Sequence, residues 1–235
     1  MKIIVFCIIF LFSQYSSANE PLKFSSVIPE NTHAFKIAKQ LVKEISSRMN
    51  RDIVLLYYPV LRSTRLLESG LIHADLSRVA SFQNLVPSAI QVEEYVTHIP
   101  YHAYSSMPDV FTVKGWSSLK PYSMVIVRGF QFSEHYLQHH KTHKIGSSLA
   151  AFKFLRAKRA DIFVESSILA ESILGIDGFD REGITRLEPP VDYLKSYTFF
   201  SHKYPKLAEQ YASALISIKA EGILKKILNG TYKPD

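Results

Sequence analysis

The stretch DIVLLYYPVLRSTRLLESGLIHADLSR, residues 52–78, decides the fold of this chain. Asp52–Tyr58 is an unbroken run of β-branched, aliphatic and aromatic residues, which is typical of a strand covered on both faces. Arg62–Glu68 predicts a short helix that ends at Gly70, and Ala74–Leu76 predicts the next strand. A strand, a helix and a second strand in this order predict a parallel sheet with right-handed crossovers.

The same alternation of strands and helices extends in both directions from this stretch. Upstream, a strand at Leu22–Val27 precedes apolar residues at helical spacing from Phe35 to Ile45, with Asn31 or Thr32 as the N-cap. Downstream, the pattern restarts with strands at Tyr122–Val127 and Asp161–Val164 and helices from Ser133, at Ser148–Arg156 and at Ser166–Leu174. Three further pieces look extended: Gln91–Tyr104, Phe111–Val113 and Tyr193–Ser201. The chain closes with helices at Pro205–Lys219 and Ile223–Leu228. Two α/β units, with the chain crossing over and returning, predict two lobes whose cleft lies at the carboxyl ends of strands.

The first residues, MKIIVFCIIFLFSQYSSA, have the organisation of an export signal. Lys2 supplies the positive charge, Ile3–Phe12 the short apolar run, and Ser16–Ala18 the small residues of a cleavage site after Ala18. The apolar run is shorter than the ~18 residues that a membrane-spanning helix needs. We therefore expect a signal peptide at 1–18 and a periplasmic protein; the alternative is a short buried N-terminal strand or helix.

Composition narrows the class of protein further. The chain is 47% hydrophobic and 21% charged, as in ordinary globular proteins. Its single cysteine, Cys7, lies in the expected leader, so disulfide and thiol chemistry are excluded from the mature chain. The formal net charge is +7. Outside the cytoplasm such a balance favours an anionic ligand or an anionic surface over nucleic acid, and is equally compatible with solubility alone.

Four ordered blocks resemble the extracellular solute-binding proteins of family 3. The first block joins Arg62–Gly70 to a strand that carries Asp75 and Arg78. The second block is Val113–Lys120, which is similar to the family's linker into the second lobe and is followed by the strand and glycine of Val125–Gly129. The third, Leu155–Val164, has the family's order of a helix, an acid and a hydrophobic strand. The fourth, Lys219–Leu228, is similar to the family's closing helix.

The resemblance implies a type II periplasmic binding protein fold, with two α/β lobes joined by two hinge strands around a cleft. It implies lobe 1 at 19–98 plus 197–235 and lobe 2 at 99–196. It further implies a monomer without a cofactor that captures a small polar or anionic solute, amino-acid-like or a carboxylate, for an ABC permease or a sensor. The chain departs from amino-acid-binding members after the third strand, where Val79–Asn84 lacks their Thr-x-Glu-Arg segment, and Ser166 stands where they place a second acid.

The candidate ligand-binding residues lie mostly at the ends of expected strands. Arg78 offers a bidentate fork for a carboxylate or phosphate, with pairing to Asp75 as its alternative role. Glu165 is the candidate for a cationic group. The remaining candidates are Arg62 and Asp75 in the first lobe, and the turn Arg128, Gly129 and Phe130 with Ser133, whose free N–H groups suit an anion. Tyr57, Tyr58, Phe82 and Trp116 are candidates for stacking or for the core.

Two other classes of function stay open on the sequence. His135, His139, His140 and His143 lie within nine residues, and the first two share a helical face, so a metal site at His135, His139 and His143 is the runner-up. The alternative reading of this cluster is a solvated face. A catalytic relative of the fold, lyase- or dehydratase-like, is the third class, although the chain has no Gly-x-Ser-x-Gly elbow and no phosphate-cradling glycine loop.

Overall fold

A computed structural model describes residues 20–107, 111–137, 141–176, 179 and 182–232. The expected export signal at 1–18 lies outside these residues. The stretch that opened the sequence analysis forms the strand, helix and strand that its pattern predicts, as β2 (Ile53–Tyr57), α2 (Val60–Ser69) and β3 (Ala74–Val79). Gly70 ends α2 in a left-handed conformation, with φ of 74°, as a C-terminal glycine commonly does.

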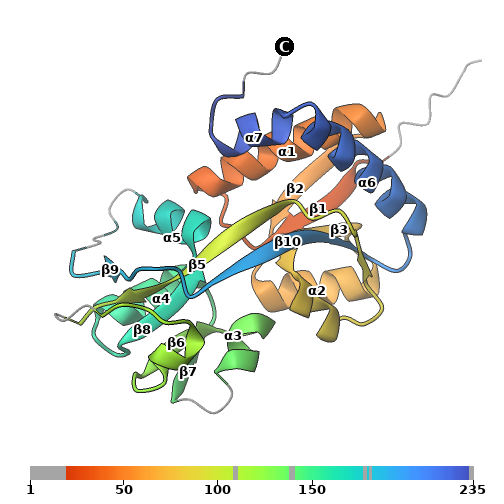
Figure 1. Ribbon diagram of the computed structural model, residues 1–235. Helices are drawn as coiled ribbons and strands as arrows, with labels where there is room; N and C mark the ends of the chain where they lie inside the picture. The colour runs from red at the N-terminus through yellow and green to blue at the C-terminus, as the bar shows by residue number, and fades with distance from the viewer. Residues whose placement is uncertain (1–19, 108–110, 138–140, 177–178, 180–181, 233–235) are drawn as a thin grey trace, which may run out of the picture.

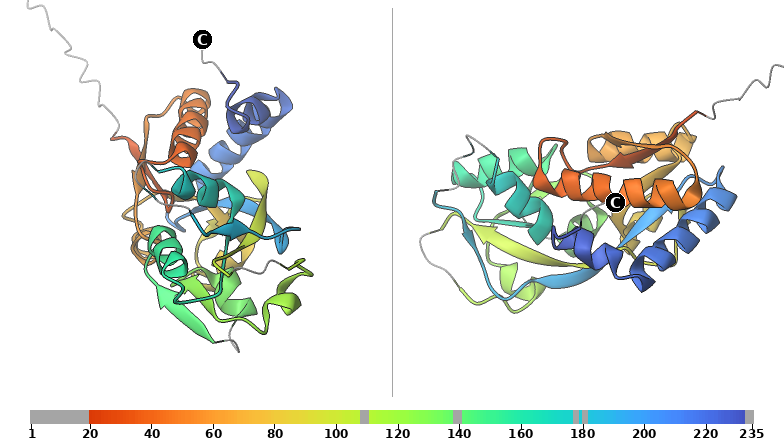
Figure 2. Two further views of the ribbon diagram at one scale, coloured as in Figure 1. Left: turned by 90° about the vertical axis from the view of Figure 1, so that its left-hand side faces the viewer. Right: turned by 90° about the horizontal axis from the view of Figure 1, so that it is seen from above.

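The first lobe completes this unit with segments from both ends of the chain. The strand β1 (Leu22–Ser26) lies between β2 and β3 and is parallel to both, so the carboxyl ends of all three meet at one edge. Thr32 caps α1 (His33–Met49) by accepting a hydrogen bond from the Phe35 N–H. It is one of the two residues that the sequence offered as the N-cap. The helix α1 packs with α6 (Pro205–Ala220) and α7 (Ile223–Leu228) at the same end of the molecule (Figure 2).

The second lobe repeats this plan. Its elements are β6 (Met124–Val127), α3 (Gln131–Tyr136), β7 (Thr142–Ile145), α4 (Ser148–Arg156), β8 (Ile162–Ser166) and α5 (Ser167–Leu174). The strand β6 lies between β7 and β8 and is parallel to both, as β1 lies between β2 and β3. The sequence pattern missed β7, because three of its four residues are polar.

Two long antiparallel strands join the lobes: β5 (Thr97–Ser105) and β10 (Asp192–Phe200). They run side by side between the two halves of the molecule (Figure 1). Because β10 also pairs with β3 and β5 with β8, the main path of the sheet is β2-β1-β3-β10-β5-β8-β6-β7. Short elements complete the fold: β4 (Ile90–Gln91), β9 (Thr185–Arg186), and the 3-10 helices η1 (Ala80–Asn84) and η2 (Trp116–Leu119). The expected extended piece at Phe111–Val113 has no regular structure.

Each lobe has a hydrophobic core of its own. In the first lobe, Phe24 packs edge-on against Phe200, and both rings contact Tyr211 of α6. In the second lobe, Phe152 of α4 packs edge-on against Tyr104 and Phe163. The second of these clusters also includes Val60 of α2, so the two lobes are in contact where they meet. Among the described residues, the helices are too short or too polar to cross a membrane.

Candidate functional site

A cavity of about 110 Å³ lies between the two lobes. The first lobe contributes the segment after β1, one face of α1 and the end of β3, and the second lobe contributes the ends of β6 and β8; β5 closes the cavity between them. Its walls are mostly aliphatic and aromatic. Among the described residues that line it, Arg78 and Glu165 are the charged ones, and each comes from a different lobe. This placement is the one that the sequence predicted for a cleft at the carboxyl ends of strands.

A β-bulge at the end of β3 orients Arg78. Arg78 pairs with Tyr197 of β10 and Asp75 pairs with Phe199, so that Leu76 and Ser77 stand opposite the single residue Thr198. Ser77 takes a left-handed backbone conformation, with φ of 67°, which a residue other than glycine adopts at an energetic cost. Bulges of this kind redirect side chains next to binding sites. The local strain at Ser77 therefore accompanies the placement of Arg78.

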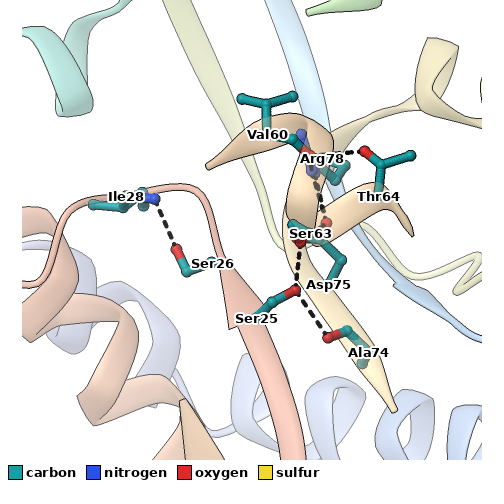
Figure 3. A network of polar contacts seen from close by, with 9 residues as sticks. All are labelled: Ser25, Ser26, Ile28, Val60, Ser63, Thr64, Ala74, Asp75 and Arg78. Carbon is teal, nitrogen blue, oxygen red and sulfur yellow. Dashed lines mark hydrogen bonds and ion pairs between the residues drawn. The ribbon is translucent and has the colours of Figure 1, made fainter. Parts of the chain in front are cut away.

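Arg78 is held by an ion pair inside the first lobe. Its Nη2 lies 2.8 Å and its Nε 2.9 Å from Oδ2 of Asp75, and the two side chains are 5% and 0% exposed (Figure 3). Nη2 also approaches the Val60 carbonyl oxygen at 3.4 Å, and the guanidinium lies 4.7 Å from the centre of the Phe82 ring. Both roles considered for Arg78 from the sequence therefore occur in one residue, because it pairs with Asp75 and also lines the cavity.

Asp75 belongs to a buried polar network behind the cavity wall. Its Oδ2 accepts a hydrogen bond from the Ser63 hydroxyl at 2.7 Å, and Ser63 is in turn 2.7 Å from the Ser25 hydroxyl (Figure 3). Its other oxygen, Oδ1, is buried with no hydrogen-bond partner among the described residues. Such a network fixes the carboxylate and through it the guanidinium. Asp75 therefore positions Arg78, and is not itself among the residues that line the cavity.

Glu165 is the buried acid of the second lobe. Its side chain accepts hydrogen bonds from the Ser148 hydroxyl at 2.6 Å and from the Ser166 N–H at 2.7 Å, and the residue is 1% exposed. Burial raises its pKa to about 7, although these hydrogen bonds to the carboxylate oppose the rise. Burial also raises the pKa of Tyr101, which lines the same cavity, and the negative charge of the Glu165 carboxylate raises it further. Glu165 therefore changes protonation state near neutral pH.

The two lobes touch around the cavity. A side chain on Gly129 would place its Cβ 2.7 Å from Cδ2 of Leu61 and 3.0 Å from Cγ1 of Val60, both on α2 of the first lobe. Gly129 also has a φ of 88°, so the turn after β6 needs glycine for its backbone and for this approach. A second contact joins the lobes, where the Ala34 N–H in the first turn of α1 donates a hydrogen bond to the Ser172 hydroxyl of α5 at 3.0 Å.

The structure brings together four of the eight predicted ligand-binding residues. Arg78, Gly129, Phe130 and Glu165 line the cavity, and Asp75 lies behind Arg78. Arg62 and Arg128 are exposed and lie away from the cavity lining: Arg62 stacks on Tyr58, and Arg128 contacts the Lys144 carbonyl oxygen. Ser133 is buried and donates to the Phe130 carbonyl oxygen. The binding role of these residues stays a prediction.

The alternative histidine metal site has no support in the geometry of the described residues. The helix α3 ends at Tyr136, His135 is exposed on it, and His143 lies on β7 beside the Phe154 ring. His139 and His140 lie outside the described residues. Across the part of the chain that the structure describes, no three His, Cys, Asp or Glu side chains gather as a metal site would require.

Several residues of the cavity were missed from the sequence. Buried Ala38 and Leu41 and half-buried Ile37 line the cavity from α1, and Leu228 reaches it from α7. Their helical spacing predicts burial, but a buried helix face looks the same whether it packs against a core or lines a cavity. The sequence also gave no indication that Ser148 would hydrogen-bond to Glu165, because the two residues lie on different elements. Of the aromatic candidates, Phe82 lines the cavity, whereas Trp116 stacks on Tyr136.

The fold is that of type II periplasmic binding proteins. A histidine kinase sensor domain with similarity to periplasmic binding proteins aligns with a TM-score of 0.77 at 11% identity, over 91% of this chain and 96% of that one. An ancestral arginine-binding protein bound to arginine gives 0.74 at 14% identity, over 92% and 100%. The GluR0 ligand-binding core of Nostoc punctiforme in complex with glutamate gives 0.71 at 13%, over 91% and 100%.

The sequence comparisons add one relative. An uncharacterized protein of Shewanella oneidensis is 25% identical over 207 residues, which cover 84% of this chain and 76% of that protein. No family model matches the chain. At the identities seen among the solved structures, the likeness shows the fold, and the function has to be argued from the site.

Proposed function

We propose that this chain is an exported, non-enzymatic solute-binding protein that captures a small molecule between its two lobes. The observation that carries this proposal is the cavity between the lobes, with buried Arg78 from one lobe and buried Glu165 from the other. A solute that contacts both groups would hold the lobes together, because only contacts made in the closed arrangement favour closure. The structural neighbours named above, which are described as binding proteins and a sensor domain, support this class of function.

The lobes are proposed to be residues 19–98 plus 197–235 and residues 99–196. The boundary after residue 98 falls within β5 and the boundary after residue 196 within β10, close to the paired residues Thr97 and Ser196. Two adjacent strand crossings form a natural hinge, since a small twist of both strands rotates one lobe relative to the other. The leader at 1–18 is proposed to direct the chain to the periplasm, where an ABC permease or a sensor would recognise the closed, monomeric form.

The solute is proposed to be amino-acid-like or a carboxylate. Nη1 of Arg78 makes no hydrogen bond among the described residues, so it is free to donate to a solute oxygen. Gly129 and Phe130 line the cavity close to α2. The Gly129 N–H already donates to the Glu134 carboxylate and the Phe130 N–H to the Val127 carbonyl oxygen, so the turn lacks the free N–H groups expected there for an anion. A guanidinium fixed by Asp75 would orient such an oxygen at little entropic cost.

A ligand screen read by two methods tests the proposal. A true solute should raise the melting temperature in proportion to RT ln(1 + [L]/Kd) and should reduce the radius of gyration in small-angle X-ray scattering if the free lobes open. The panel contains the common amino acids and small carboxylates. Arg78→Met should abolish the thermal shift, and substitution of an exposed arginine outside the cavity, Arg65→Met, should leave it unchanged. Failure of every solute in the panel to stabilise the protein would contradict the proposal.

A further inference from the structure

A second hollow, of about 350 Å³, is open to solvent on the first lobe, beside the start of β5. This lysine groove is lined by Tyr95–His98, Lys219, Leu224, Lys225, Leu228 and Asn229. Its walls therefore come from the segment that leads into β5, from the last turn of α6 and from α7. Val96, Thr97 and Leu228 also line the cavity between the lobes, so the two spaces share part of one wall.

Three lysines lie at or beside this groove. Lys219 is held in place, because its Nζ pairs with the Glu94 carboxylate, donates to the Tyr95 carbonyl oxygen at 2.9 Å and lies 3.6 Å from the centre of the Tyr95 ring. Lys195 of β10 approaches the same ring at 4.9 Å, and Lys225 is exposed on α7. Neither Lys195 nor Lys225 forms an ion pair among the described residues. Two of the three positive charges are therefore unmatched.

The surface between the lysines is apolar. Leu224 and Leu228 are one turn apart on α7 and share the lining with Val96 and the ring of Tyr95. A site for a free small molecule usually encloses most of its ligand, whereas this groove is open. A segment of a larger partner can stay partly exposed, because contacts elsewhere add to its affinity. The unmatched lysines favour acidic side chains on that segment, and the leucines favour an apolar side chain between them.

The groove lies where the two proposed lobes join. His98 pairs with Lys195, and Thr97 with Ser196, across β5 and β10. Lys195 therefore belongs to the second proposed lobe and Lys225 to the first, and a rotation of the lobes changes the distance between the two ammonium groups. A partner that contacts both lysines can distinguish the closed arrangement from the open one.

We propose that the lysine groove docks an acidic segment of the protein that receives the solute. Acidic side chains of this segment pair with Lys195 and Lys225, and an apolar side chain packs on Leu224 and Leu228. Only the identity of the receiving protein, a permease or a sensor, rests on the proposed function. An anionic membrane surface fits less well, because a flat bilayer contacts protruding groups, whereas Lys219 and Tyr95 are half-buried in a hollow.

Three fluorescein-labelled peptides test the chemistry of the groove by fluorescence anisotropy. The peptide LEELEE carries acidic and apolar side chains, LQQLQQ lacks the charges, and SEESEE lacks the apolar groups. We expect LEELEE to bind, with an affinity that falls as salt is added, and the other two to bind at least roughly tenfold more weakly. Equal binding of LQQLQQ would overturn the role of the lysines, and equal binding of SEESEE would overturn that of the leucines.

A matched set of variants tests the location. Lys195→Gln and Lys225→Gln should each weaken LEELEE by roughly fivefold or more, and both positions are exposed, so neither substitution should change the fold. Lys153→Gln removes the same charge from an exposed position on α4 of the second lobe and should leave the affinity unchanged. An equal loss in all three variants would assign the binding to net charge and would overturn the groove as its site.

The remaining outcomes separate this inference from its alternatives. Silence of LEELEE, together with a Lys225-dependent capture by vesicles that contain phosphatidylglycerol, would assign the surface to a membrane and overturn the inference; silence in both assays would overturn it as well. Solute capture is measured apart, in the ligand screen, so either result can fail while the other stands. A solute found in that screen should change the Kd of LEELEE by roughly fivefold or more, and an unchanged Kd would overturn the sensing of lobe closure.

Discussion

One oxygen of Asp75 binds the guanidinium of Arg78 twice, with Nη2 at 2.8 Å and Nε at 2.9 Å from Oδ2. The pair is buried at the end of β3, and the other Asp75 oxygen has no partner among the described residues. This arrangement makes Arg78 a fixed donor and leaves Nη1 for the cavity. It also means that Arg78 cannot be removed without consequences for the free protein.

Removing Arg78 alone should destabilise the protein. Arg78→Met leaves a buried carboxylate without its cation, so we expect the free energy of unfolding to fall by about 3–5 kcal/mol. The double variant Arg78→Met/Asp75→Asn removes both charges and should recover a large part of this loss. Urea denaturation of the two single variants and the double variant gives the coupling energy, with exposed Arg65→Met as the control. Additive effects of the two substitutions would argue against the pair as a stabilising unit.

Glu165 should make stability depend on pH near neutrality. Its pKa is raised from 4.5 to about 7, so the folded protein binds this proton more tightly than the unfolded chain. The free energy of unfolding should therefore fall as the pH rises from about 4.5 to about 7 and then level off. The contribution is on the order of 3 kcal/mol, since a tenfold change in proton affinity corresponds to about 1.4 kcal/mol. Glu165→Gln should lack this decline, measured by denaturation between pH 5 and pH 8. The exposed control Glu171→Gln should follow the wild type, and a decline that persists in Glu165→Gln would assign it to another group.

The strained backbone at Ser77 predicts an unusual order of stability. Glycine adopts the left-handed conformation without a clash, whereas a β-branched residue adopts it least readily, so stability should decrease from Ser77→Gly through the wild type to Ser77→Val. We expect Ser77→Val to cost about 1–3 kcal/mol. Thermal and chemical denaturation of the three proteins measure this order. Equal stability of the valine variant and the wild type would show that the bulge at β3 relaxes at no cost.

Gly129 should control how closely the lobes approach. Gly129→Ala introduces a Cβ 2.7 Å from Cδ2 of Leu61, so the Leu61 side chain must turn aside or the lobes must separate. We expect weaker solute binding and a larger radius of gyration for the solute-bound protein in small-angle X-ray scattering. Gly115→Ala is the matched control, because Gly115 also has a positive φ, 64°, but a Cβ added there would meet no atom within 4 Å. If both alanine variants bind solute equally, steric contact at Gly129 does not limit closure.

Local patterns predicted the elements more readily than the site. The helix at Ser148–Arg156 has the bounds expected from the sequence, and β2, α2 and β3 lie where strand and helix patterns place them. The strand β7 was missed, because Thr142–Ile145 contains histidine and lysine and lacks the apolar alternation of a half-buried strand. The alternative metal cluster depended on His135 and His139 sharing one helix, and α3 ends at Tyr136.

For the candidate site residues, the sequence indicates the kind of side chain and its position relative to a strand, but not the direction in which the side chain points. Arg78 lies near the end of β3 and Arg128 directly follows β6, yet Arg78 lines the cavity, whereas Arg128 is exposed beside the Lys144 carbonyl oxygen. The bulge at Ser77 accounts for the orientation of the first, and no sequence pattern marks that bulge. Arginine at the end of a strand is therefore weak evidence for a binding site until the backbone register is known.

The sequence by itself determined the two α/β units, because periodicity and strand composition depend on neighbours along the chain. Only the tertiary structure decided that Arg78 is neutralised by Asp75, that Glu165 has no cation beside it among the described residues, and that the face of α1 around Ile37 lines a cavity. These properties depend on distances between residues of different elements and on burial. Such contacts form only when the elements and lobes pack together, so the spacing of residues along the chain does not predict them.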